Sequence, residues 1–141
     1  MHNIDQMIRD YYKAFNERRF EDAAALYTAD AVIQHRPDGS PLKGPEGYIE
    51  SSRLTMAVAP DLQLQVLRVE QRGDTIVEID VLATGTHQGD WNMGALGVAK
   101  ATGSKLNVRV REMLEIRGGM ITFSSLSYDL QDFVGKPRPP R

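Results

Sequence analysis

The spacing of apolar residues changes once along this chain, at Pro60, and that change limits the folds available to it. Before Pro60 the apolar residues recur every three or four positions, which is typical of amphipathic helices. After Pro60 they alternate with polar residues, which is typical of half-buried strands. With 141 residues, about the size of one domain, this order predicts an α+β fold in which a curved antiparallel sheet wraps around N-terminal helices.

The two patterns divide into seven long segments and one short one. Helices are predicted at residues 4–15 and 20–27 and from residue 45 to a point before Pro60, with a brief strand at residues 31–33. Long strands are predicted at residues 62–69, 75–87, 105–117 and 120–128, with a bulge near Val66 where the alternation changes parity. No repeat or linker interrupts residues 1–134, so we expect a single domain there and a Pro/Arg-rich tail at residues 135–141.

Composition excludes several classes of function. Lys and Arg number 17 against 19 Asp and Glu, so a nucleic-acid partner is disfavoured. The absence of cysteine rules out disulfides, thiolate nucleophiles and cysteine-bound metals. The histidines at positions 2, 35 and 87 are too scattered for a metal-ligand cluster. No apolar run could span a membrane, and the N-terminus lacks the layout of a signal peptide, so we expect a cytoplasmic protein.

Acidic residues occur inside strands that otherwise read as apolar. Asp80 lies on the less apolar face of the segment 75–87, and either it reaches water or its strand faces a cavity in which an acid is useful. Because neither face of this strand is fully polar, we expect helices around a pocket on one side and a second copy of the chain on the other, as a homodimer. Glu112 is a second acid out of place, since it shares a face with Leu106 and Ile116.

Several stretches in fixed order resemble the SnoaL-like polyketide cyclase family of the nuclear transport factor 2-like superfamily. They are "FEDAAALYTADAVIQH", "LKGPEGYIES", "APDLQLQV", "TGTHQGDW", "ATGSKLNVR" and "IRGGMITFSSLSYDLQDF". The resemblance runs from about Tyr11 to Phe133. The resemblance implies a cone-shaped α+β barrel, usually dimeric, whose cavity is closed by the helices. It also implies chemistry that needs neither a metal nor an organic cofactor.

The resemblance also suggests catalytic residues. The cyclases carry an acid/base Asp in the last strand, which corresponds to Asp129. The limonene epoxide hydrolase branch has two acids at positions that correspond to Asp80 and Asp129, but its arginine is replaced here by Glu78. His35, which ends the first short strand, and His87, in the "TGTH" segment, are further catalytic candidates.

The predicted function follows from this set of residues. We expect a cofactor-independent cyclase-like enzyme that closes an aromatic polyketide intermediate by an intramolecular aldol reaction, with Asp129 as acid/base and Asp80 second. The alternatives are a related hydroxylase or epoxide-hydrolase-like enzyme that uses both Asp residues, and a non-catalytic small-molecule-binding domain. The residues predicted to line the hydrophobic pocket are Phe15, Tyr27, Met56, Trp91, Met93, Arg109 and Arg111.

Overall fold

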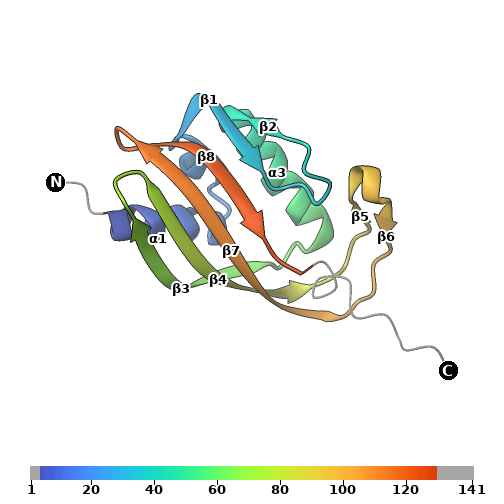
Figure 1. Ribbon diagram of the computed structural model, residues 1–141. Coiled ribbons are helices and arrows are strands. Elements are labelled where there is room, and N and C mark those ends of the chain that lie inside the picture. Colours follow the sequence, from blue (N-terminus) through green and yellow to red (C-terminus); the bar gives the residue numbers. More distant parts are fainter. Residues whose placement is uncertain (1–3, 130–141) are drawn as a thin grey trace.

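The structure, a computed structural model, describes residues 4–129 and confirms the α+β class with helices first (Figure 1). The helices are α1 (Ile4–Asn16), α2 (Phe20–Ala24) and α3 (Gly44–Val58), with a short 3-10 helix at Gly94–Leu96. The strands are β1 (Tyr27–Gln34), β2 (Leu42–Lys43), β3 (Gln63–Arg72), β4 (Ile76–Thr86), β5 (Trp91–Asn92), β6 (Val98–Ala99), β7 (Lys105–Arg117) and β8 (Met120–Ser127). The predicted tail at residues 135–141 lies outside the described residues.

Six of the strands form one curved sheet in the order β2-β1-β8-β7-β4-β3. The four long strands pair antiparallel, as predicted, and β8 lies between β7 and β1 (Figure 1). The pairing of β8 with β1, which the sequence left open, is parallel. The sheet is also open rather than closed into a barrel, because β2 and β3 form its two edges. The predicted bulge is confirmed, since the β3–β4 register shifts between Val66 and Arg68.

The core lies between the helices and the inner face of the sheet. Alternation in β4 turns Val77, Ile79, Val81 and Ala83 inward, and each is at most 2% exposed. β7 turns inward every second residue from Leu106 to Ile116, and α1 contributes Ile8 and Phe15 from above. Burial of each Val, Leu, Ile or Phe side chain among them stabilises the fold by roughly 1.5 to 3 kcal/mol.

Two local differences from the predicted elements have clear physical causes. The second helix ends at Ala24 rather than at residue 27, because Tyr27 begins β1 and pairs with Ile121 of β8. The glycine-rich connection after β4 is not irregular throughout, because Trp91 pairs with Ala99 in the small β5–β6 hairpin. Within residues 4–129, no helix combines the length and the apolar character that crossing a membrane requires.

Candidate functional site

A cavity of about 390 Å³ opens between the helices and the inner face of the sheet. Its volume lies within the roughly 300 to 1,000 Å³ that is usual for small-molecule sites. Most of its wall is apolar or aromatic, and α1, α3, β4, β7 and the β5–β6 hairpin all contribute to it. The polar exceptions at its inner end are His35, Ser51, Ser52 and Glu112.

Glu112 is the most deeply buried acid of this wall, at 2% exposure. It stands on β7 among the inward positions of that strand, opposite Ile79 of β4. The hydroxyl of Tyr12 donates to its Oε1, and the hydroxyl of Ser124 donates to its Oε2. Tyr11 adds a longer contact, with its hydroxyl 3.4 Å from Oε2. These donors offset the cost of removing a carboxylate from water, which is prohibitive for an isolated charge.

His35 connects this carboxylate to the open part of the cavity. It follows the last residue of β1, and its side chain is 10% exposed. Its Nε2 lies 2.7 Å from Ser124 Oγ and 3.5 Å from Glu112 Oε2. Its Nδ1 lies 3.0 Å from the Oγ of Ser51, which α3 supplies. The imidazole is therefore held on both nitrogens while it lines the cavity.

Tyrosines surround the carboxylate and remain protonated. Burial, and after it the charge of Glu112, raises the pKa of Tyr11, Tyr12 and Tyr27 well above the ordinary value of 10.0. The same two causes raise the pKa of Tyr48. The hydroxyls of Tyr11 and Tyr27 also bond to each other. At neutral pH all of these groups are hydrogen-bond donors, so the inner end of the cavity is rich in O–H groups around one acceptor.

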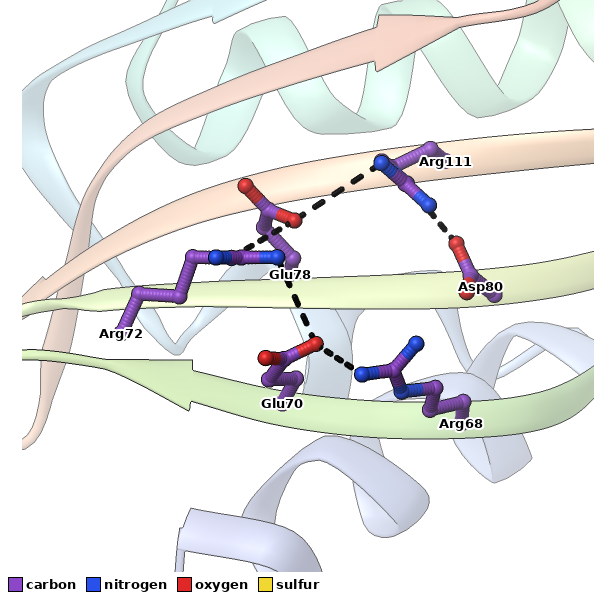
Figure 2. A network of polar contacts seen from close by, with 6 residues as sticks. All are labelled: Arg68, Glu70, Arg72, Glu78, Asp80 and Arg111. Carbon is purple, nitrogen blue, oxygen red and sulfur yellow. Dashed lines mark hydrogen bonds and ion pairs between the residues drawn. The ribbon is translucent and has the colours of Figure 1, made fainter.

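Asp80 does not face this cavity, and the expectation that it would is wrong. It belongs to the outward positions of β4, where its Oδ1 accepts a hydrogen bond of 2.9 Å from Arg111 Nε (Figure 2). Glu78, two residues earlier, pairs with Arg72 of β3 at 3.0 Å on the same outer surface. Because side chains alternate along a strand, the inward turn of Ile79 and Val81 carries Asp80 to the opposite face.

Asp129 and His87, two further proposed catalytic residues, are also not part of the cavity wall. Asp129 is exposed at the end of β8 and is not part of the cavity wall, although its neighbour Tyr128 is. His87 is fully buried outside the wall, with its Nδ1 3.3 Å from Thr102 Oγ1. Among the residues described, Nε2 of His87 has no hydrogen-bond partner. Of the four candidates, His35 is the one that the structure places in the cavity.

The predicted pocket residues divide in the same way. Phe15, Trp91 and Met93 are in the cavity wall. Tyr27 lies beneath it, in contact with Tyr11. Three others are outside: Met56 lines a separate surface hollow beside α2, and Arg109 and Arg111 are exposed on the outer face of β7.

The sequence interpretation singled out Glu112 as an acid out of place but gave it no role in the site, and it missed Ser51 and Ser124. For Glu112 a signal existed, because its parity within β7 already placed it among apolar inward residues. Ser51 and Ser124 gave no comparable signal, since they are ordinary serines far from His35 in the sequence. In the part of the chain from residue 4 to residue 129, no three His, Asp or Glu side chains gather as a metal site would require.

Comparison with known proteins supports the assignment of the fold. Residues 8–124 match the family described as the SnoaL-like domain. IdmH of Streptomyces antibioticus, a proposed polyketide cyclase, is 27% identical with a TM-score of 0.73 over 94% of this chain and 96% of its own. AclR of Streptomyces galilaeus, a proposed hydroxylase, is 16% identical, with a TM-score of 0.72 over 91% of this chain and 90% of its own. A protein of Catenulispora acidiphila with a ketosteroid isomerase-like fold, solved with trimethylamine, is 19% identical with a TM-score of 0.74 over 92% of both chains. No curated protein matches this chain in sequence.

Proposed function

This chain belongs to the SnoaL-like domain family, and from that premise we propose that it is a cofactor-independent acid/base enzyme that closes a polyketide-type molecule into a ring. The observation that carries the proposal is the pairing of His35 with the buried Glu112 at the inner end of a largely apolar cavity. This chain is similar to IdmH, which is described as a proposed polyketide cyclase, and the similarity supports a polyketide-type substrate.

His35 is the acid/base in this scheme. Its imidazole takes a proton from the carbon between two carbonyl groups of the substrate, which leaves an enolate. The enolate carbon then bonds to the carbon of a third carbonyl group, further along the same molecule. The oxygen of that third carbonyl takes the proton from the imidazolium. One C–C bond forms, one C–H bond is exchanged for an O–H bond, and no oxidant is consumed.

Glu112 stabilises the imidazolium that exists between the two proton transfers. Its Oε2 is 3.5 Å from His35 Nε2, and both groups are shielded from water by the cavity wall. Opposite charges at this separation attract much more strongly in a protein interior than in water. The hydroxyls of Tyr12 and Ser124 hold the carboxylate in place during this step.

The apolar wall provides the second contribution to rate. A linear polyketide has many rotatable bonds, and ring closure requires two distant carbons to meet. Phe15, Leu126 and Trp91 limit the shapes that a bound chain can take. Positioning of this kind is worth roughly 7 to 11 kcal/mol in favourable cases.

The two-aspartate hydroxylase or hydrolase has less support. That scheme needs Asp80 and Asp129 to share one reacting centre, whereas Asp80 lies on the outer face of β4 and Asp129 is outside the cavity wall. Similarity to AclR, at 16% identity, extends to the fold alone. A domain that binds a ligand without reaction is separated from the enzyme by the experiment below.

The experiment measures ring closure of a linear poly-β-keto methyl ester by chromatography and mass spectrometry. We expect His35→Asn and Glu112→Gln each to reduce the turnover rate by about 10²-fold or more, the usual contribution of acid/base groups. Asp80→Asn is the matched control, since it neutralises an acid of the neighbouring strand that lies outside the cavity, and its rate should stay within about twofold of wild type.

Three results would contradict the proposal. They are an unchanged rate in His35→Asn, a loss confined to Asp129→Asn, and an absence of any catalysed turnover despite ligand binding. Incorporation of labelled oxygen from water into the product would instead identify hydration or hydrolysis.

A further inference from the structure

Ser124 has an unusual position between the two groups of the proposed acid/base pair. Its residue is fully buried, and its Oγ contacts both His35 Nε2, at 2.7 Å, and Glu112 Oε2. A serine hydroxyl has a single hydrogen, so it can donate to only one of these two neighbours and must accept from the other. The direction of this one hydrogen bond therefore fixes which nitrogen of His35 carries a proton.

The hydroxyls around Glu112 favour one direction. Tyr12 donates to Oε1, Tyr11 approaches Oε2, and Ser124 also meets Oε2. An ionised carboxylate is acceptor-only and satisfies all three donors together. With Ser124 donating to Glu112, its oxygen is left to accept from His35, and this requires a proton on Nε2.

The other side of the ring agrees with this arrangement. A neutral imidazole with its proton on Nε2 has an unprotonated Nδ1 that can only accept. Ser51 Oγ lies 3.0 Å from Nδ1 and supplies a hydroxyl to it from α3. Ser51 is itself part of the cavity wall, so the basic nitrogen lies beside the cavity. Because the Ser51 hydroxyl occupies the lone pair of Nδ1, a bound substrate has to displace this hydroxyl before Nδ1 can take a proton.

We propose that Ser124 is a positioning residue that holds His35 in the Nε2–H tautomer and leaves Nδ1 as the base. Glu112 then acts on His35 mainly through the Ser124 hydroxyl. This inference rests on the proposed function for its rate effects, described below. The tautomer itself can be measured without any substrate. The opposite tautomer would require Glu112 to be protonated and to donate to Ser124.

The test records long-range ¹⁵N–¹H correlation spectra of the histidine rings at increasing pH, until the ¹⁵N shifts of the rings no longer change. With three histidines in the chain, a His35→Asn spectrum assigns the His35 signals by their disappearance. In wild type we expect a protonated Nε2 and an unprotonated Nδ1 for His35. A protonated Nδ1 would overturn the proposal, and this measurement needs no variant of Ser124 to fold.

Variants of Ser124 then test whether the serine causes the preference. Ser124→Ala should shift His35 toward a mixture of tautomers. It should also reduce kcat by about 10-fold or more with little change in KM, because it removes part of the roughly 10²- to 10⁴-fold contribution of acid/base catalysis. Ser124→Thr retains a hydroxyl and should recover the wild-type spectrum. Ser125→Ala, the adjacent residue of β8 outside the cavity wall, is the matched control and should change neither measurement.

The two proposals fail in different ways. An unchanged tautomer in a folded Ser124→Ala would remove the positioning role of Ser124 and leave His35 as the acid/base. A confirmed Nε2–H tautomer together with no catalysed ring closure would retain the hydrogen-bond arrangement and remove the proposed function instead.

Discussion

Two acids on neighbouring strands illustrate how one residue of register decides the environment of a side chain. In the β4–β7 pairing, Ile79 is opposite Glu112 and Asp80 is opposite Arg111. Glu112 therefore enters the core and is held by hydroxyl groups, whereas Asp80 reaches the outer surface and is held by a guanidinium. The buried acid has the local hydrogen-bond network, and the exposed one has the counter-charge.

This contrast predicts that removing the carboxylate of Glu112 lowers the stability of the fold much more than removing that of Asp80. Glu112→Leu removes the acceptor from two buried hydroxyls and should lower the free energy of unfolding by roughly 2 to 6 kcal/mol, at about 1 to 3 kcal/mol for each orphaned group. Asp80→Leu breaks an exposed pair and should have a much smaller effect. Urea unfolding monitored by circular dichroism gives both values. A Glu112→Leu protein more stable than wild type would instead mark this carboxylate as a group retained for function at the expense of stability.

The same contrast shows what could be predicted of the site from the sequence. Parity within residues 105–117 was visible and placed Glu112 inward, so the buried acid was accessible to prediction. The partners of His35 were not, because Ser51 and Ser124 are separated from it by 16 and 89 residues and meet it only in the folded sheet. Asp80 was misplaced since its strand is apolar enough on both faces to permit either orientation.

Among the elements, the β5–β6 hairpin depends on a few contacts at the cavity mouth. Asp38 Oδ2 accepts a hydrogen bond of 3.2 Å from the backbone N–H of Ala95, and its Oδ1 accepts two from Ser40. Gly94 allows this approach, because a Cβ there would lie 2.1 Å from Asp38 Oδ2. The hairpin carries Trp91 and Met93 into the cavity wall.

The hydrogen bonds that Asp38 accepts at the cavity mouth should persist in moderately acidic solution. The hydroxyl of Ser40, then its backbone N–H and that of Ala95, lower the pKa of Asp38 to about 2 from an ordinary 3.8. A depressed pKa in the folded state means that the contribution of Asp38 is complete above pH 3.8 and is lost as the pH falls through about 2. Hydrogen exchange at Ala95 should therefore be faster in Asp38→Ala than in wild type at every pH above about 4, with exchange at Val108 of β7 as the internal control. Equal exchange rates at Ala95 would show that Asp38 does not hold the hairpin.

At this scale the sequence predicted the long elements well and the short ones poorly. Residues 105–117 form β7 as predicted, because the alternation there is unbroken over the whole strand. The hairpin strands escaped prediction since two residues are too few to show a period. The parallel β1–β8 pair was also missed, because periodicity indicates which face of a strand is buried but not which strand lies beside it.

The core of the molecule contains several buried tyrosines that must stay protonated in the folded state. They predict how the stability of the fold changes in alkaline solution. Tyr11, Tyr12 and Tyr27 have pKa values raised above 10.0 by burial and by the charge of Glu112. A raised pKa means that their contribution is complete below the unfolded-state value near 10 and is lost as the pH rises toward the folded-state values. The unfolding free energy should therefore fall steeply above about pH 10, and the tyrosinate absorbance of these groups should appear together with unfolding.

Substitution separates this cause from general alkaline damage. Tyr27→Phe removes one raised ionisation and should make the alkaline fall in stability shallower than in wild type. Tyr128→Phe, at the cavity mouth, is a comparison in which burial alone raises the pKa to about 12. Tyrosinate absorbance that develops fully in the folded protein would contradict the coupling of these ionisations to unfolding.

The homodimer expected from the sequence remains a proposal. The outer surface of β3, β4 and β7 bears the alternating charges of Arg68, Glu70, Arg72, Glu78, Asp80 and Arg111 (Figure 2). These charges pair with one another within the chain. If a second copy covers this surface, the contact buries that network, and sedimentation should show a dimer that dissociates in Arg111→Glu, where the pairing is broken. A wild-type protein that sediments as a monomer would remove the proposal.

The position of β8 also governs when a newly made chain can acquire its site. His35 follows β1 and Glu112 is on β7, and these strands border β8 on opposite sides without pairing with each other. β8 is the last strand of the described chain, so the two halves of the site are joined only after residues 120–127 have left the ribosome. A chain that ends before β8 has a carboxylate at position 112 without its serine donor, so the site cannot be complete before residues 120–127 are present.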